Sequence, residues 1–232
     1  MNDTQLKQHL EKLKSSETND RQEAIQQLST LEMVTDDVIK SLMECGIGDP
    51  EEHIRVEAIR ALSEMSEHVD NKQQITSMLK QTLKDESVEV RNISLEAIEN
   101  LGISDSEVVD CLVAMLSNSD EEEEIRESVC RILGFLNNPN PSVLGILIKS
   151  LSDECVEIRA NAAQSLGLLG VGSDKVVEAL ERTAKDEEYV VRNEASKALK
   201  MLEKAGSYQF TKSDGSNISN SNNLTSNFSK SN

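Results

Sequence analysis

Three histidines give the first test for metal-binding or acid–base chemistry in this chain. His9, His53 and His68 are the only imidazoles in the sequence, and imidazole is both a common metal ligand and a base that titrates near neutral pH. Two histidines four residues apart on one helix face can hold a metal ion together. No pair here has that spacing, so the sequence predicts no histidine-based metal site.

Four cysteines are the next reactive groups. Cys45, Cys111, Cys130 and Cys155 lie far apart, without a C-x-x-C pair, and each falls in or beside an apolar helical pattern. We interpret them as small core residues of a protein in a reducing compartment. A disulfide or metal role is the alternative interpretation.

An acidic run from Asp120 to Glu124 resembles a cation site only superficially. Calcium-binding loops space their oxygen ligands around a turn that contains glycine. This run instead leads directly into a helical pattern, where acidic residues favour the positive N-terminal end of the helix. The sequence also has no G-x-x-x-x-G-K or G-x-S-x-G motif, so we expect no catalytic residue, no cofactor and no enzymatic activity.

A different spacing recurs through the chain: an aspartate, an arginine six residues later, and Ile or Val just before the arginine. The five copies pair Asp49 with Arg55, Asp85 with Arg91, Asp120 with Arg126, Asp153 with Arg159, and Asp186 with Arg192. Successive arginines are 33 to 36 residues apart. Arg21 extends the series by one unit, with Ser15 in the aspartate position. Such a period indicates stacked repeats, and six units fit.

The residues that follow each arginine predict an amphipathic helix. Small or apolar side chains recur three, seven and ten positions on, as in Ala58, Leu62 and Met65, and this spacing places them on one helix face. A second apolar helical pattern lies between successive copies. Each unit is therefore a helix hairpin that can bury its apolar face only against a neighbour. The fold class that we expect is all-α.

Composition and charge indicate what the core is made of and which classes of binding partner to expect. Aromatic residues make up only 2% of the chain, so the core must consist of aliphatic side chains. The formal charge of −18 repels phosphate backbones and anionic lipids, and we therefore expect no nucleic acid and no membrane as partner. Because the chain has neither a long apolar segment nor an apolar signal sequence at its start, we expect a cytoplasmic protein.

The complete pattern, D-x(4)-[IV]-R-x(2)-A-x(3)-L-x(2)-[LM], resembles that of HEAT-repeat proteins, and most of all the short HEAT-like repeats of the bilin lyase type. The resemblance implies a right-handed α-solenoid of about six two-helix repeats whose second helices line a concave face. It also implies that the five aspartates form a ladder with arginines along the loops between repeats. A carboxylate there can accept from helix N–H groups and from a guanidinium, so we assign these residues to structure.

The repeat pattern divides the chain into two regions. Residues 1–205 are predicted to form the solenoid. Residues 206–232 are rich in serine and asparagine and show no apolar period, so they are predicted to be a disordered tail.

A candidate binding surface follows from the implied concave face. Positions one, two, five and nine after each arginine avoid the core stripe, and the ninth position holds Thr30, Glu64, Asn100, Phe135, Leu168 and Met201. The last three would form an exposed apolar row, with Ile93 and Arg131 nearby, as expected for an interaction site. The alternative is that the three pack as residues at the edge of the core.

Three hypotheses for function remain open. The first is a scaffold or adaptor that holds a partner protein with basic or apolar segments on an acidic concave surface. The second, implied by the resemblance alone, is a non-catalytic or catalytic subunit of a bilin lyase-like modifying enzyme. The third is a divergent relative of deoxyhypusine hydroxylase, an oxidoreductase of similar repeats that binds iron through several His-Glu dipeptides; this sequence contains none.

Overall fold

The computed structural model describes residues 2–31, 34–65 and 72–207, so the part of the predicted tail from residue 208 onward lies outside the described residues. His68 also lies outside them. The described residues form twelve α-helices and no β-strand. The helices are α1 (Asp3–Lys12), α2 (Thr18–Ser29), α3 (Asp36–Gly48), α4 (Glu52–Met65), α5 (Lys72–Thr82), α6 (Val88–Leu101), α7 (Ser106–Ser117), α8 (Glu123–Phe135), α9 (Pro141–Ser150), α10 (Val156–Leu169), α11 (Asp174–Thr183) and α12 (Tyr189–Lys204).

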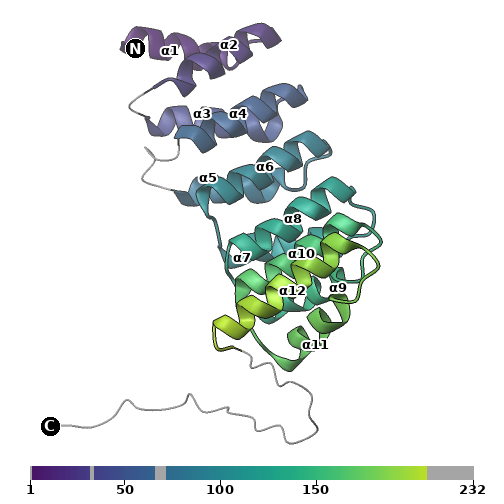
Figure 1. The fold of residues 1–232 in the computed structure, drawn as a ribbon. Helices are drawn as coiled ribbons and strands as arrows, with labels where there is room; N and C mark the ends of the chain where they lie inside the picture. Colours follow the sequence, from purple (N-terminus) through teal and green to yellow (C-terminus); the bar gives the residue numbers. More distant parts are fainter. Residues whose placement is uncertain (1, 32–33, 66–71, 208–232) are drawn as a thin grey trace, which may run out of the picture.

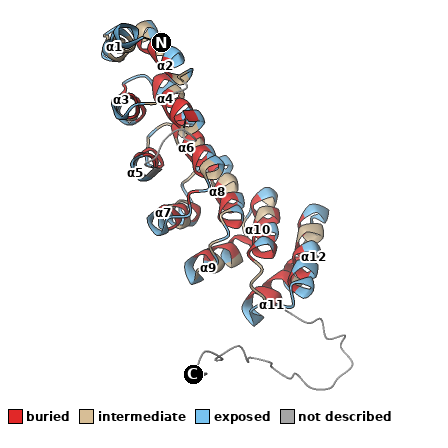
Figure 2. Ribbon diagram, turned by 90° about the vertical axis from the view of Figure 1, so that its left-hand side faces the viewer, coloured by how far each residue is buried: buried red, intermediate tan, exposed pale blue. Residues whose placement is uncertain are grey.

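Successive helices pair into six hairpins that stack along one direction (Figure 1). Each even-numbered helix contacts the next even-numbered one, and helices α3 to α11 of the odd-numbered set do the same. Figure 2 shows these two layers nearly end-on, with the stack bending so that the even-numbered helices form the inner layer and the odd-numbered helices the outer layer. The prediction of an all-α solenoid of six two-helix repeats is confirmed.

The core lies between the two layers and along the contacts between repeats. The residues three positions after each arginine are all fully buried, namely Ala24, Ala58, Ser94, Val129, Ala162 and Ala195. The residues at the seventh position are buried in the same way, from Leu28 in α2 to Leu199 in α12. The single polar member of the first set, Ser94, donates a hydrogen bond to the Val90 carbonyl or to Thr82 Oγ1, each 2.7 Å away, so its burial leaves no unmet hydrogen bond.

Two glycines let the inner helices approach most closely in the C-terminal half. A Cβ atom on Gly134 of α8 would lie 2.4 Å from Ser165 Oγ of α10, and a Cβ on Gly167 of α10 would lie 2.8 Å from the Ala198 backbone of α12. Both distances are shorter than any side chain tolerates. Earlier repeats have Ser29, Ser63 and Glu99 at the corresponding position. The tight contact is therefore a property of α8, α10 and α12.

We expect Gly134→Ala to destabilise the solenoid by about 1–3 kcal/mol, because the added methyl overpacks the α8–α10 contact. Urea denaturation followed by circular dichroism measures this. Gly145→Ala in α9 is the matched control, since a Cβ there meets no atom within 4 Å and alanine is the better helix former, by about 0.5–1 kcal/mol. Equal effects of the two substitutions would contradict the close contact.

Candidate functional site

Five arginines of the inner layer each bind a carboxylate of the following repeat, and we call these contacts the arginine ladder. The most buried is the two-pronged pair of Arg21 with Asp49, at 2.6 and 2.9 Å, with side chains 8% and 4% exposed. Arg159 holds Asp186 through the same two prongs, at 2.9 and 3.1 Å. The other pairs are Arg55 with Asp85 at 2.7 Å, Arg91 with Glu121 at 2.7 Å and Arg126 with Asp153 at 2.5 Å.

Each ladder aspartate also shapes the loop in which it lies. Its side-chain Oδ1 accepts the main-chain N–H two residues further on, at 2.8 to 3.0 Å; the donors are Glu51, Ser87, Cys155 and Glu188. This side-chain turn sets the chain up to enter the next inner helix. The same carboxylate therefore orders its own loop and ties it to the preceding repeat.

The repeat arginines are held in place by their own loops. In four of the six repeats, Nη1 of the arginine donates to the main-chain carbonyl of the ladder aspartate six residues earlier; these donors are Arg55, Arg91, Arg159 and Arg192, at 2.6 to 2.9 Å. Arg21 makes the same contact with the Ser15 carbonyl at 3.0 Å. A guanidinium fixed in this way can present its remaining N–H groups to the next repeat without losing further side-chain freedom.

The ladder changes the titration of its members. The hydrogen bonds that Arg159 donates to Asp186 raise the pKa of Arg159 and lower the pKa of Asp186. The Glu188 N–H and Arg192 lower the pKa of Asp186 further. Asp186 is therefore charged throughout the neutral range. Arg159 and Asp186 thus keep their opposite charges at neutral pH, as expected for a structural ion pair.

The assignment of Asp120 to the ladder is wrong. Asp120 is exposed, and Arg91 binds Glu121 at 2.7 Å and Glu122 at 2.6 Å instead. The physical reason lies two residues before Asp120. The other repeats have an apolar residue at this position, namely Leu13, Ile47, Leu83, Leu151 and Ala184. Asn118 is polar, and its Oδ1 accepts the Asp120 N–H at 3.1 Å. The loop turns early, and the next carboxylate reaches the arginine.

Arg21 is a ladder member to which the sequence analysis gave no carboxylate partner. It binds Asp49 although its own unit has Ser15 in place of the aspartate, because the arginine donates forward to the next repeat. The spacing of Arg21 in the repeat series was the signal for this role. Ser15 in the aspartate position means only that the first repeat offers no ladder carboxylate to a repeat preceding it.

Phe135, Leu168 and Met201, which we call the concave row, occupy three neighbouring inner helices, α8, α10 and α12. Their side chains are 57%, 48% and 41% exposed. Arg131 of α8 is also exposed and forms an ion pair with Glu99 of α6. The structure thus brings four of the five predicted binding residues to the open side of the inner layer.

Ile93, the fifth predicted binding residue, is buried, and its assignment to the binding surface is wrong. The second position after the arginine faces the preceding repeat: Asn161, at this position in α10, donates to Glu127 of α8 at 3.3 Å. An apolar side chain at that position is drawn into the contact between α4 and α6. Ile93 therefore belongs to the core.

The described histidine and cysteine side chains do not gather at one site. Among residues 2–31, 34–65 and 72–207, no three His, Cys, Asp or Glu side chains are placed to share a metal ion. Cys45 and Cys130 are buried, which raises the pKa of the Cys45 thiol to about 11 and that of Cys130 further. Cys111 and Cys155 are partly exposed and do not belong to the fully buried core.

No helix in the described part of the chain has the length and apolar character needed to cross a bilayer.

Substitution of the two candidate carboxylates separates the observed ladder from the predicted one. We expect Glu121→Gln to lower the free energy of unfolding by about 1–3 kcal/mol, because Arg91 then loses a largely buried charged partner. Asp120→Asn should change it by less than about 0.5 kcal/mol, as for an exposed residue. Urea denaturation at pH 7 measures both, and a larger loss for Asp120→Asn would restore the original assignment.

The lowered pKa of Asp186 predicts a pH dependence. The unfolded chain binds a proton at Asp186 more readily than the folded chain, so this residue stabilises the fold above its ordinary pKa of about 4 and loses that effect as the pH falls through the lowered value. Asp186→Asn should remove this contribution. Unfolding free energies measured between pH 2.5 and 7 should therefore rise less steeply with pH in the variant; parallel curves would contradict the pairing.

Comparison with known proteins agrees with this architecture. The family described as HEAT repeats matches residues 75–144 and 144–210. No curated protein matches the chain significantly. A designed armadillo repeat protein in complex with the peptide (KR)4 is similar in fold, with a TM-score of 0.60 and 21% identity over 85% of this chain and 99% of that one.

Two engineered proteins are also similar to this chain in fold. The crystal structure of one has a TM-score of 0.59 and 18% identity over 88% of this chain and 98% of that one. A second has a TM-score of 0.58 and 19% identity over 88% of this chain and its own full length. The sequence match spans more than half of the chain, and the stacked hairpins with their arginine ladder agree with it: the chain belongs to the HEAT-repeat family.

Proposed function

We propose that this protein is a binding scaffold, acting without catalysis, whose inner layer holds a segment of a partner protein. The observation that carries the proposal is the concave row, because Phe135, Leu168 and Met201 are large apolar side chains exposed in register on three adjacent helices. An apolar group of this kind within a polar surface is typical of interaction sites. If these three side chains were instead residues at the edge of the core, their exposure would have no explanation.

Close helix packing brings the concave row together. Phe135 and Leu168 directly follow Gly134 and Gly167, the two glycines at which the inner helices approach most closely. Met201 Sδ lies 3.4 Å from the position of a Cβ on Gly167, so Met201 covers the backbone beside Leu168. A row held on tightly packed helices loses little freedom when a partner binds, which favours affinity.

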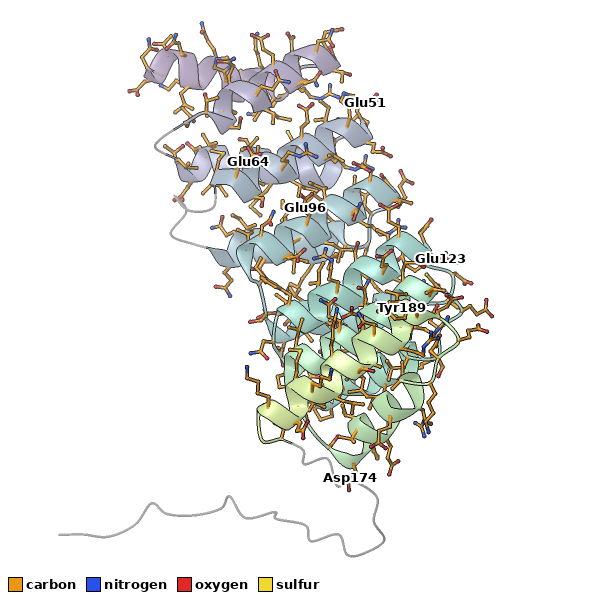
Figure 3. The ribbon with its side chains drawn as sticks, in the orientation of Figure 1. Glu51, Glu64, Glu96, Glu123, Asp174 and Tyr189 are labelled. Atoms are coloured by element: carbon orange, nitrogen blue, oxygen red, sulfur yellow. The ribbon has the colours of Figure 1, made fainter. Side chains whose placement is uncertain are left out.

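The other half of the inner layer supplies acidic groups. At the first, second, fifth and ninth positions after the arginines of α2, α4 and α6 the charged residues are Glu23, Glu57, Arg60, Glu64 and Glu96, four acids and one base. Figure 3 shows Glu64 and Glu96 on the side of α4 and α6 that is turned to the viewer. At the same positions of α8, α10 and α12 the charges balance, with Arg131 and Lys197 against Glu127 and Glu194. The inner face is thus acidic toward one end and apolar toward the other.

A partner segment that fits this face has basic residues followed by apolar ones. The designed armadillo neighbour binds the alternating peptide (KR)4, which is consistent with an inner helix layer acting as a cradle for a cationic chain. Eight extended residues span about 26 Å, close to the width of three helices spaced 8–10 Å apart. A (KR)4 segment would therefore cover α2 to α6, and residues attached to it would reach the concave row.

A two-part peptide tests the proposal. Its first part is (KR)4, and its second part, joined by a short Gly-Ser linker, carries Leu and Phe. We expect the intact peptide to bind more tightly than either part, and Phe135→Ser with Leu168→Ser to weaken its binding at least tenfold while the melting temperature changes little. Isothermal titration calorimetry measures the affinity. Raised salt should weaken the (KR)4 part selectively.

Ile47→Ser is the matched control, because Ile47 is an exposed aliphatic residue of the outer-layer helix α3, 38% accessible. This change should leave peptide affinity unchanged. Two results would refute the proposal: equal binding by the concave-row variant and the unsubstituted protein, or a large loss of stability in that variant, which would place the row in the core.

A further inference from the structure

Arg192 has the setting of a ladder arginine, but it has no carboxylate partner among the described residues. Its Nη1 donates to the carbonyls of Asp186 and Glu187, both at 2.6 Å. Arg159 in the preceding repeat makes the same two contacts, with the Asp153 and Glu154 carbonyls, and uses its remaining N–H groups on Asp186. Arg192 has no ion pair with any residue in the described part of the chain. Its guanidinium is anchored through Nη1 as in the ladder. The Nε–H and Nη2–H groups, which bind the carboxylate in Arg159, are the ones that remain for a ligand.

The neighbouring residue repeats this incomplete pattern. Asn92 follows Arg91 and donates from its amide to Glu124 of the next repeat at 3.2 Å, and Gln22 follows Arg21 and donates to Glu57 of the next repeat at 2.6 Å. Asn193 follows Arg192, and its amide donates to Glu194 beside it, at 3.3 Å. Two donors that serve acidic partners elsewhere in the stack are thus presented together at its C-terminal end.

The aromatic ring and the basic residues near Arg192 favour binding of an acidic ligand. The Tyr189 ring lies under the guanidinium, 5.9 Å from its centre to the ring centroid, and Tyr189 and Val190 are 72% and 46% exposed. Figure 3 shows Tyr189 on the front of α12 near its first turn. Helix α12 carries Arg192, Lys197, Lys200 and Lys204 against two glutamates and follows the acidic loop of residues 186–188. Arg159 binds its carboxylate after a similar acidic loop, with Asp153 and Glu154. An aromatic platform beside a pre-positioned arginine strengthens its bond to a carboxylate by excluding water.

We propose that Arg192, Asn193 and Tyr189 form a carboxylate-binding site on the C-terminal end of the stack, for an aspartate or glutamate at the start of a helix in a partner protein. The occupant is defined by the ladder, where each aspartate reaches the arginine from the loop that opens a helix. This site is separate from the concave row and does not depend on it. A second copy of this chain, stacked end to end, would offer Ser15 at the ladder position and no carboxylate.

Nuclear magnetic resonance of the full-length ¹⁵N-labelled chain tests this through the Nε–Hε signal of Arg192, assigned by its loss in Arg192→Lys. The probe is a peptide with the sequence of residues 150–158 and Cys155→Ser, which contains the ladder aspartate Asp153. The matched peptide carries Asp153→Asn and keeps both glutamates. We expect the first peptide to move the Arg192 signal progressively, and the second to move it at most a third as far at the same concentration. The exposed Arg60 serves as the internal reference.

Three results would overturn the proposal. Equal shifts with both peptides, or none, would show that the guanidinium does not select the helix-entry carboxylate. A shift of the Arg192 signal with protein concentration alone would assign the site to a second copy of the chain. A shift caused by Asp214→Asn in the unliganded protein would assign it to the tail of the same chain. Unchanged backbone amide signals in Arg192→Lys show that the variant remains folded, and binding of the (KR)4-based peptide reports on the concave row independently.

Discussion

The structure depends on the contact between one repeat and the next, because a helix hairpin cannot bury its apolar face alone. Fully buried alanines, leucines and isoleucines supply the non-directional part of that contact. The directional part is the bond between an arginine anchored on its own loop and a carboxylate on the following loop. Because each arginine donates forward, the same bond recurs along the stack, and the last arginine, Arg192, has no such carboxylate among the described residues.

Because these charges are buried, the ladder contributes more to the correct register of one repeat on the next than to net stability. Taking a guanidinium and a carboxylate out of water costs several kcal/mol each, and their attraction roughly offsets that only when all donors and acceptors are satisfied. Arg21 and Asp49 meet this condition through two main-chain carbonyls, one main-chain N–H and a two-pronged bond. A slipped stack would leave such groups buried without partners, at a cost of about 1–3 kcal/mol for each neutral group and more for each charge. The ladder therefore penalises misalignment of repeats.

The open side of the inner layer follows from the same packing. Gly134 and Gly167 allow the inner helices to approach closely, and the residue after each glycine, Phe135 or Leu168, is a large apolar side chain that stays exposed. In the N-terminal half the corresponding positions hold polar residues, and the inner face there is rich in glutamate. A scaffold built in this way can separate an acidic from an apolar region without a pocket, since the helices themselves are the surface.

The period of 33 to 36 residues determined the fold class, the number of repeats and the buried positions, because a helix spacing of three and four admits one burial pattern. The sequence also placed Phe135, Leu168 and Met201 on one line. Only the tertiary structure decided that Glu121 replaces Asp120 and that Ile93 is buried. The first depends on how one polar residue, Asn118, redirects a loop, and the second on which flank of a helix meets its neighbour. Both are contacts between segments about thirty residues apart, and no local pattern encodes the distance between them.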